Sequence, residues 1–432
     1  MRVMYLSPTG QLGGAESSLV DILASLRCVE PSWPLHLLAA SDGPMLGRVR
    51  SLGVTAEVVP FPEAIARLGE HGATASGGSA RLVAQILLAS PAALRYRAAL
   101  TRAIEAFDPA ILHTNGLKMH LLGAWACRPN RRPALVWHLH DYLGGRPTTT
   151  RLLRWHHGHP AVVVTNSASV AADAARSLAN GTPVVTVHNG VDLDRFSTTG
   201  ARANLDAMAG MPQAPPNTVR VGLVATLARW KGHATFLEAI ARLPAQLPVR
   251  AYVVGDAVYQ TEGSQYSLDE LRELARSLGV ADRVGFTGFV HTPEATFRAL
   301  QVVVHASTAP EPFGLVIAEA MSCGRAVIVS NAGGAAEIVE PGVDALVHAP
   351  GDAGDLAAQI AALAGDAELR ARLGRAARAT AERSFDRARM AAELVPIYRA
   401  AAAVAKAGVG SRRHPAHEGR PGDGETDCTL VD

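Results

Sequence analysis

The chain has 432 residues, of which 48% are hydrophobic and 19% charged, so it can bury the cores of two or three domains. Its formal net charge of +2 argues against a general nucleic-acid-binding protein, because such proteins usually carry a large basic excess. No apolar run reaches the roughly 18 residues that a membrane-spanning helix needs.

The cysteines and the first residues bear on the compartment. The start of the chain, MRVMYLS, is too short and too quickly polar for a signal peptide and is expected to form a strand. Four scattered cysteines form no C-x-x-C pair and are expected to be free thiols of a reducing compartment: Cys28, Cys127, Cys323 and Cys428. We therefore expect a cytoplasmic protein, and peripheral contact with the inner face of a membrane stays open.

Short apolar runs alternate with helical patterns along the whole chain, which is typical of α/β folds with parallel sheets covered on both faces. The first half is expected to contain strands at 2–7, 35–40, 110–115, 134–140, 161–167 and 183–190. The second half is expected to contain strands at 220–226, 250–256, 283–289, 302–307 and 326–331. This pattern predicts two Rossmann-like domains.

A small, polar, Pro-rich stretch at 197–218 separates the two halves and is interpreted as a linker. It divides the chain into a first domain, 1–196, and a second domain, 219–385. Residues 386–405 are expected to form a last helix that completes the first domain. The tail at 408–432 is rich in Gly, Pro and charge and is expected to be disordered.

Residues 63–105 combine a Gly-rich stretch with an Arg-containing helical pattern. They are interpreted as a mobile loop followed by an amphipathic helix. An ordinary surface helix and a helix that contacts a membrane are both compatible with this pattern.

The first strand leads into Gly10, Gly13 and Gly14, which precede a helix expected to begin near Ala15. Glycines let the backbone approach a ligand closely, and a helix N-terminus offers free N–H groups to an anion. The spacing differs from G-x-G-x-x-G, so dinucleotide binding is only weakly supported. A tight turn with no ligand is the alternative.

A second candidate group follows the strand at 134–140, where His140 and Asp141 come directly after apolar residues. Ligands of open α/β sheets lie beyond the carboxyl ends of strands, so both side chains are placed to meet a substrate. A purely structural histidine is the alternative. The nearby histidines at 156–159 do not match a usual zinc spacing, and no metal site is expected.

Arg229, Lys231 and Gly232 lie where another strand passes into a helix. Cations beside a helix N-terminus can bind a diphosphate, although a solvated basic turn has the same composition.

In the run APEPFGLVIAEAMSCG, Gly314 and Leu315 open a helix that Gly324 closes, with Glu311 before the helix and Glu319 at least one turn into it. A carboxylate accepts hydrogen bonds from vicinal hydroxyls, so the two glutamates fit the two sugars of a sugar nucleotide. A surface charge at Glu311, a buried salt bridge at Glu319, and a glycosidase pair are the alternatives.

Together these segments resemble the retaining glycosyltransferases of family 4. The resemblance covers residues 1 to about 400 and rests on GGAE at 13–16, HD at 140–141, VHNGVD at 187–192, KG at 231–232 and, most specifically, the stretch at 311–339. It implies the GT-B fold, with two Rossmann-like domains whose parallel sheets face a central cleft, and transfer of a sugar from a UDP- or GDP-sugar without cofactor or metal.

The resemblance also implies roles for individual residues. Glu311 would bind hydroxyls of the transferred sugar, and Glu319 the ribose. Lys231 would hold the diphosphate together with the backbone amides of Phe313, Gly314 and Leu315. His140 would lie beside the donor sugar, and Gly13 and Gly14 would let the first domain close onto the diphosphate.

One position departs from the family pattern. The arginine expected five residues before Lys231 is Thr226 here, and Arg229 is a candidate to supply the missing charge. Two other functions stay open: a catalytically silent scaffold that binds sugar nucleotides, and a nucleotide-sugar epimerase of the same fold. The resemblance identifies neither the donor sugar nor the acceptor, which could be lipid-linked or small.

Overall fold

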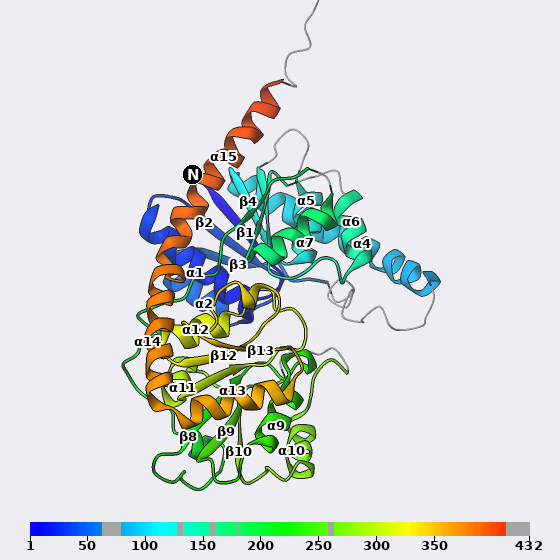
Figure 1. Ribbon diagram of the computed structural model, residues 1–432. Helices are drawn as coiled ribbons and strands as arrows, with labels where there is room; N and C mark the ends of the chain where they lie inside the picture. Colours follow the sequence, from blue (N-terminus) through cyan, green and yellow to red (C-terminus); the bar gives the residue numbers. More distant parts are fainter. Residues whose placement is uncertain (63–78, 128–132, 156–159, 180, 258–262, 412–432) are drawn as a thin grey trace, which may run out of the picture.

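The computed structural model describes residues 1–62, 79–127, 133–155, 160–179, 181–257 and 263–411. It forms two α/β domains, one above the other in Figure 1, and the last helices run along both of them. The predicted loop at 63–78 and the tail from 412 onward lie outside the described residues.

The first domain is built on a sheet of seven parallel strands in the order β3-β2-β1-β4-β5-β6-β7. Its central strands are buried along their whole length, which explains their continuous apolar sequence. The strands are β1 (Val3–Ser7), β2 (Leu35–Ala39), β3 (Thr55–Val58), β4 (Ile111–Asn115), β5 (Ala134–Leu139), β6 (Val162–Thr165) and β7 (Val184–Thr186).

Helices cover both faces of this sheet. They are α1 (Gly14–Val29), α2 (Pro44–Ser51), α4 (Ser79–Phe107), α5 (Leu117–Ala126), α6 (Pro147–Trp155) and α7 (Ala168–Leu178). The second half of α4 packs against the sheet through Tyr96, Leu100 and Ile104. This half of the predicted amphipathic helix therefore belongs to the core of the first domain.

The second domain has a sheet of six parallel strands in the order β10-β9-β8-β11-β12-β13. The strands are β8 (Val219–Val224), β9 (Val249–Val254), β10 (Val284–Gly288), β11 (Val302–His305), β12 (Ala326–Ser330) and β13 (Leu346–His348). The helices are η1 (Arg229–Lys231), α9 (His233–Arg242), α10 (Leu268–Ser277), α11 (Pro293–Ala299), α12 (Leu315–Ser322), η2 (Gly334–Ala336), α13 (Ala353–Gly365) and α14 (Ala367–Ser384).

These two sheets confirm the predicted α/β class and the predicted parallel strands. In each sheet the strand order reverses once, between β1 and β4 and between β8 and β11. Ligands of open parallel sheets bind beside the carboxyl ends of the strands at such a reversal. The glycine-rich loop follows β1, whereas the loops that carry Lys231 and Glu311 follow β8 and β11.

The connection between the domains is more ordered than its sequence suggests. It contains the short helix α8 (Leu205–Met208), and the carboxylate of Asp206 there accepts hydrogen bonds from Tyr252, Arg250 and Arg220. Burial raises the pKa of Asp206, but these bonds outweigh it and hold the pKa well below its usual range. The carboxylate therefore ties the connection to the sheet of the second domain.

The last helix, α15 (Ala388–Ser411), returns from the second domain and packs on α1 and β5 of the first domain (Figure 1). The hydroxyl of Tyr398 lies 2.7 Å from Nδ1 of His113 and 3.3 Å from the hydroxyl of Tyr5. Gly190 lets the two crossing segments touch, because a Cβ there would lie 2.5 Å from Cα of Arg387. The helix continues past residue 408, where the sequence predicts the tail to begin.

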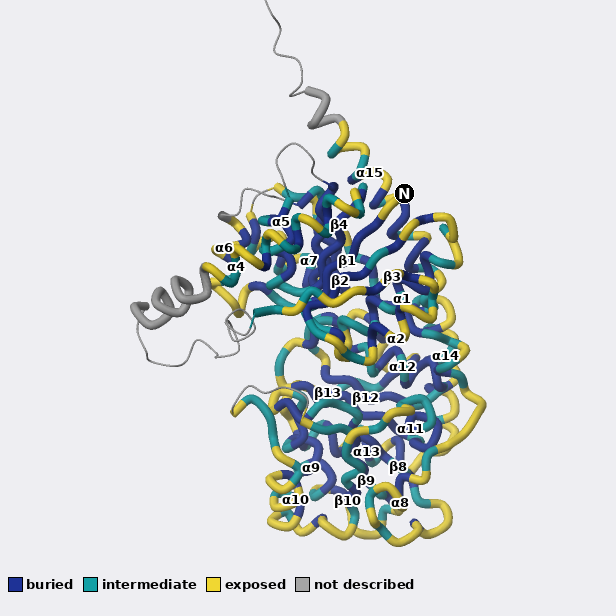
Figure 2. Tube along the Cα trace, turned by 180° about the vertical axis from the view of Figure 1, so that it is seen from behind, coloured by how far each residue is buried: buried dark blue, intermediate teal, exposed yellow. Residues whose placement is uncertain are grey.

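Burial follows this architecture. Figure 2 shows the central strands of both sheets mostly in the buried class, and the exposed residues concentrate on the outer helices and loops. No helix among the described residues is long and apolar enough to cross a bilayer.

Candidate active site

The glycines after β1 have different structural roles. A Cβ at Gly10 would lie 2.5 Å from the carbonyl oxygen of Ser41, so this glycine is required by the packing of the loop. A Cβ at Gly14 would meet nothing within 4 Å, and one at Gly13 would meet only the side chain of Glu16. The start of α1 is therefore open to a ligand at Gly14, and the protein's own packing does not explain this glycine.

Asn115, a residue that sequence reasoning missed, connects His140 to this open helix start by hydrogen bonds. Nε2 of His140 is 2.6 Å from Oδ1 of Asn115, and Nδ2 of Asn115 donates to the carbonyl oxygen of Ala15 over 3.4 Å. The ring of His138 packs against that of His140 in a tilted arrangement, with ring centroids 4.0 Å apart. Burial lowers the pKa of His140 to about 4, so its imidazole is neutral at pH 7.

Asp141 has partners in the loop that follows β5. Its carboxylate forms an ion pair with Arg146 and accepts a hydrogen bond from the backbone amide of Tyr142. Burial raises the pKa of Asp141, and the charge of Arg146 opposes this rise. Asp141 therefore shapes the loop after β5, and the predicted contact with a substrate stays untested.

Lys231 ends η1, a tight turn that follows β8. The turn continues through Gly232, whose φ of +76° favours glycine and where a Cβ would lie 1.9 Å from the carbonyl oxygen of Ala306. The backbone can therefore lie directly against the loop after β11. The ammonium of Lys231 also lies 4.0 Å from the ring centroid of Trp230, whose side chain is partly exposed.

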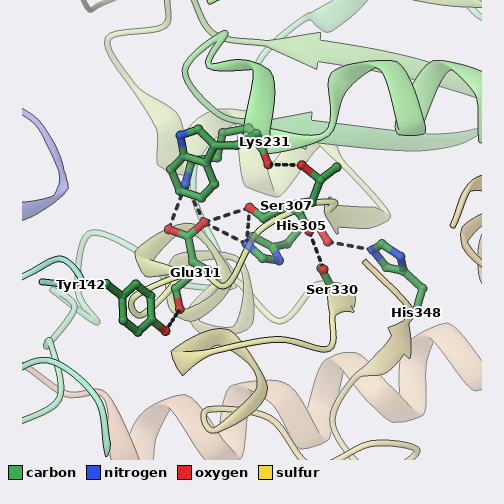
Figure 3. Close-up of polar contacts among 9 residues, drawn as sticks. Tyr142, Lys231, His305, Ser307, Glu311, Ser330 and His348 are labelled. Carbon is green, nitrogen blue, oxygen red and sulfur yellow. Dashed lines mark hydrogen bonds and ion pairs between the residues drawn. The ribbon is translucent and has the colours of Figure 1, made fainter. Parts of the chain in front are cut away.

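The carboxylate of Glu311 lies at the centre of a compact polar cluster (Figure 3). Nζ of Lys231 donates to Oε1 and Oε2 of Glu311 over 2.9 and 2.7 Å. Ser307 donates to Oε2 over 2.9 Å, and Nε2 of His305 lies 3.2 Å from the same oxygen. Glu311 is 7% exposed, which excludes the interpretation of this residue as a surface charge.

Opposing effects set the ionisation of this cluster. Burial raises the pKa of Glu311, but the charge of Lys231 and the hydrogen bond from His305 outweigh it and lower the pKa to about 2. Burial also lowers the pKa of His305, despite the nearby carboxylate. At neutral pH the cluster therefore contains one ammonium, one carboxylate and a neutral imidazole that donates from Nε2.

Two further residues contact the backbone of His305 and Ser307. The hydroxyl of Ser330 donates to the carbonyl oxygen of Ser307 over 2.6 Å, and Nε2 of His348 lies 3.2 Å from the carbonyl oxygen of His305 (Figure 3). Ser330 ends β12 and His348 ends β13, the two strands that follow β11 in the sheet, so the sheet fixes the backbone that carries the donors to Glu311.

Arg229 is directed elsewhere. Its guanidinium donates to Glu270 over 2.8 Å and to the carbonyl oxygen of Gly263 over 3.1 Å, and it lies over the ring of Tyr266. The guanidinium of Arg229 therefore interacts with residues outside the Lys231–Glu311 pair. The proposal that Arg229 replaces the charge missing at Thr226 therefore gains no support from its position.

The start of α12 has the geometry expected of an anion site. Gly314 has a φ of +90° and precedes the helix, and Gly324 with a φ of +65° follows its end. The amides of Phe313, Gly314 and Leu315 donate no hydrogen bond to the described part of the protein. Phe313 itself is buried against Phe385 and His188, so only its backbone faces a ligand.

The side chain of Glu319, one turn into α12, has no hydrogen bond or ion pair within the described residues. The alternative interpretation of Glu319 as a member of a buried salt bridge is therefore not supported there. Burial raises the pKa of Glu319 to about 8, which Arg195 opposes and Asp21 reinforces. A partly buried carboxylate without donors is suited to accept hydrogen bonds from hydroxyl groups.

Sequence reasoning identified the two residues at the centre of the cluster but missed their neighbours. His305 and Ser307 belong to a strand end that the sequence marked only as apolar, and Tyr142 comes from the other domain. His305 and Ser307 lie at the carboxyl end of β11, a strand at the order reversal of the second sheet, and this position is the signal that could have found them. Among the residues that the structure describes, no three His, Cys, Asp or Glu side chains are grouped to hold a metal ion, and the histidines at 156–159 lie outside that part.

Comparison with known proteins identifies the family. Residues 50–195 match Glycosyltransferase Family 4, and residues 212–380 match Glycosyl transferases group 1. The chain belongs to glycosyltransferase family 4. The crystal structure of Anabaena Alr3699/HepE in complex with UDP-glucose aligns with 94% of this chain and with the whole of the HepE chain. The sequence identity is 27% and the TM-score 0.74. The GT-B fold is thereby confirmed.

Other relatives are similar over part of their length. The D-inositol 3-phosphate glycosyltransferase of Streptomyces scabiei is 34% identical over 244 residues, which are 55% of this chain and 54% of that protein. The chain thus spans about half the length of the curated relatives it matches. Sucrose-phosphate synthase of Thermosynechococcus elongatus shares the fold, with 20% identity, 94% of this chain covered, all of that chain covered and a TM-score of 0.70.

The raised pKa of Glu319 predicts a pH-dependent stability. An ordinary glutamate has a pKa of 4.5 and Glu319 one of about 8, so between these values the folded chain holds a proton that the unfolded chain releases. This site therefore makes the protein less stable as pH rises from about 5 to 8. In urea unfolding, Glu319→Gln should gain more stability at pH 9 than at pH 6, by on the order of 1–2 kcal/mol. Glu340→Gln, at an exposed carboxylate, is the control. Parallel pH profiles for wild type and Glu319→Gln would contradict the assignment.

Proposed function

We propose that the chain transfers a sugar from a nucleoside-diphosphate sugar to an acceptor hydroxyl with retention of configuration. The observation that carries this proposal is the Lys231–Glu311 pair beside the start of α12. Within the described residues, the amides at this start and the side chain of Glu319 in the helix form no hydrogen bond. Family membership and the similarity to HepE, crystallised with UDP and with UDP-glucose, support a UDP-sugar as donor.

In the unliganded protein Lys231 and Glu311 satisfy each other. A bound donor would separate Lys231 from Glu311. Its diphosphate would bind the ammonium of Lys231 and the backbone amides of Phe313, Gly314 and Leu315, and its sugar hydroxyls would donate hydrogen bonds to Glu311. His305 and Ser307 would keep their hydrogen bonds to Glu311 and hold it ionised. The ribose hydroxyls would donate to Glu319, which favours its charged form.

The reaction needs stabilisation of the negative charge that develops on the leaving diphosphate. Lys231 and the amides at the start of α12 are fixed before reaction, and loss of one such donor typically lowers kcat by about 10²–10³. We propose that these groups act without a bound metal and that the departing phosphate takes the proton of the acceptor hydroxyl as it attacks from the same face. His140, neutral at pH 7, would lie beside the donor sugar as a hydrogen-bonding partner.

The acceptor side belongs to the first domain. The similarity to D-inositol 3-phosphate glycosyltransferases supports a small, hydroxyl-rich acceptor, and a lipid-linked or polysaccharide acceptor is equally compatible with the fold. We place the reaction in the cytoplasm, with the membrane surface as one possible location of the acceptor.

A catalytically silent protein that binds sugar nucleotides is the second candidate. Thr226 stands where the family has an arginine, and the guanidinium of Arg229 is held by Glu270. A protein with one phosphate ligand fewer could bind a nucleotide without turning the donor over. Incubation with several UDP- and GDP-sugars, with release of nucleoside diphosphate measured, separates the two functions.

Replacement of Lys231 tests the proposed diphosphate site. Lys231→Met should abolish release of UDP from a UDP-sugar and also lower stability by about 2 kcal/mol, because it leaves Glu311 buried without its cation. The double variant Lys231→Met/Glu311→Gln should recover stability but not turnover. Arg272→Met, at an exposed cation of α10, is the control. Turnover near the wild-type level in a stable Lys231 variant would refute the assignment.

The two kinds of glycine give a second test. Gly14→Ala should fold as well as wild type, because the added methyl group meets nothing in the protein and alanine favours a helix start over glycine. It should nevertheless weaken UDP binding, measured by titration calorimetry, at least tenfold. Gly10→Ala should instead lower the unfolding temperature, because its methyl group would collide with the backbone of Ser41. Unchanged UDP affinity in Gly14→Ala would remove the first domain from the diphosphate site.

A further inference from the structure

The loop that carries Glu311 is held by both domains. The carbonyl oxygen of Glu311 accepts a hydrogen bond of 2.7 Å from the amide of Gly334 in the second domain. The same oxygen accepts one of 3.3 Å from the hydroxyl of Tyr142, which comes from the first domain (Figure 3). The hydroxyl of Tyr142 also lies 2.9 Å from Oγ of Ser169 at the start of α7. The first domain therefore contributes one of the contacts that position Glu311.

Glu337 makes a second bridge between the domains. This residue directly follows η2 in the second domain, and its carboxylate accepts hydrogen bonds from the amides of Ala168 and Ser169 over 2.8 and 2.6 Å. These amides belong to the first turn of α7, whose N-terminus attracts negative charge. The second domain thus supplies a carboxylate cap for a helix of the first domain.

Two glycines that lie between Glu311 and Glu337 in the sequence, Gly333 and Gly334, permit the close approach of the two domains. Gly333 has a φ of +68°, and a Cβ there would lie 2.5 Å from the hydroxyl of Tyr142. A Cβ at Gly334 would lie 2.8 Å from Cβ of Ser167 and 2.1 Å from the carbonyl oxygen of Pro312. A side chain at either position would collide with the first domain. The close contact between the two domains therefore depends on glycine at both positions.

We propose that Glu337 and Tyr142 are positioning residues, which set the loop of Glu311 for reaction only while the two domains touch. The inference rests on the proposed function, since it assigns the two residues a role in donor turnover. Glu337 is exposed, and hydrogen bonds of an exposed carboxylate at a helix end are weak enough to break and re-form. Separation of the domains would release the Glu311 loop, and contact would restore it, so the acceptor domain controls the residue that binds the donor sugar.

Three variants and three measurements test the proposal. In Glu337→Ala, kcat for a UDP-sugar should fall about tenfold while the Kd of UDP stays within twofold, because the loss affects positioning and not the nucleotide site. Small-angle X-ray scattering of the unliganded variant should show a larger radius of gyration. Glu337→Gln should lie between wild type and Glu337→Ala, because its amide oxygen still accepts a hydrogen bond. Glu340→Ala, an exposed glutamate in the same loop, should match wild type.

Several outcomes would overturn the inference. A Glu337→Ala protein with wild-type kcat and radius of gyration would show that the bridge has no role. A parallel weakening of UDP binding and turnover would make Glu337 part of the nucleotide site instead. If the wild-type protein turned over no UDP-sugar, the proposed enzyme function would fail. The scattering measurement would then decide alone whether Glu337 holds the domains together, since an unchanged radius of gyration overturns that role as well.

Discussion

The ion pair of Lys231 and Glu311 is the interaction on which the candidate site depends. A buried carboxylate is unfavourable unless it is paired and hydrogen-bonded, and Glu311 meets both conditions through Lys231, His305 and Ser307. The pair joins the loops after β8 and β11, neighbouring strands on either side of the order reversal. An apolar run can therefore contain a glutamate because the sheet brings a cation to it.

The backbone around this pair is shaped by glycines with distinct tasks. Gly232 and Gly333 have left-handed φ angles and lie against other backbone or side chains, so their identity is explained by the fold. Gly14 has free space beside it, so packing does not explain its identity, and binding of a ligand is the role that we propose for it. Contacts within the protein thus separate the glycines that the loops require from a glycine that packing leaves unexplained.

The sequence predicted the architecture well, because long buried strands have continuous apolar runs. It missed β3 and β13, which are short and include residues that are exposed or only partly buried. It also treated the linker as irregular, since nothing local reveals that Asp206 would meet three partners from the second domain. Alternation of strand and helix is a local signal, whereas these features depend on residues distant in the chain.

The same limit applies to the site. Glycine turns and the spacing of Glu311 and Glu319 mark the proposed donor site in the sequence, but the pairing of Glu311 with Lys231 joins residues 80 positions apart. The contact of Glu337 with α7 was invisible, because its partners are backbone amides without a sequence signature. Arg229 looked suited to a diphosphate by position alone, and only the structure shows Glu270 beside it.

A crystal structure of the protein with a bound UDP-sugar tests the central claim most directly. The account predicts that Nζ of Lys231 leaves the carboxylate of Glu311 for the diphosphate, and that Glu311 accepts hydrogen bonds from the sugar while keeping those from Ser307 and His305. An intact Lys231–Glu311 pair with the nucleotide bound elsewhere would contradict it.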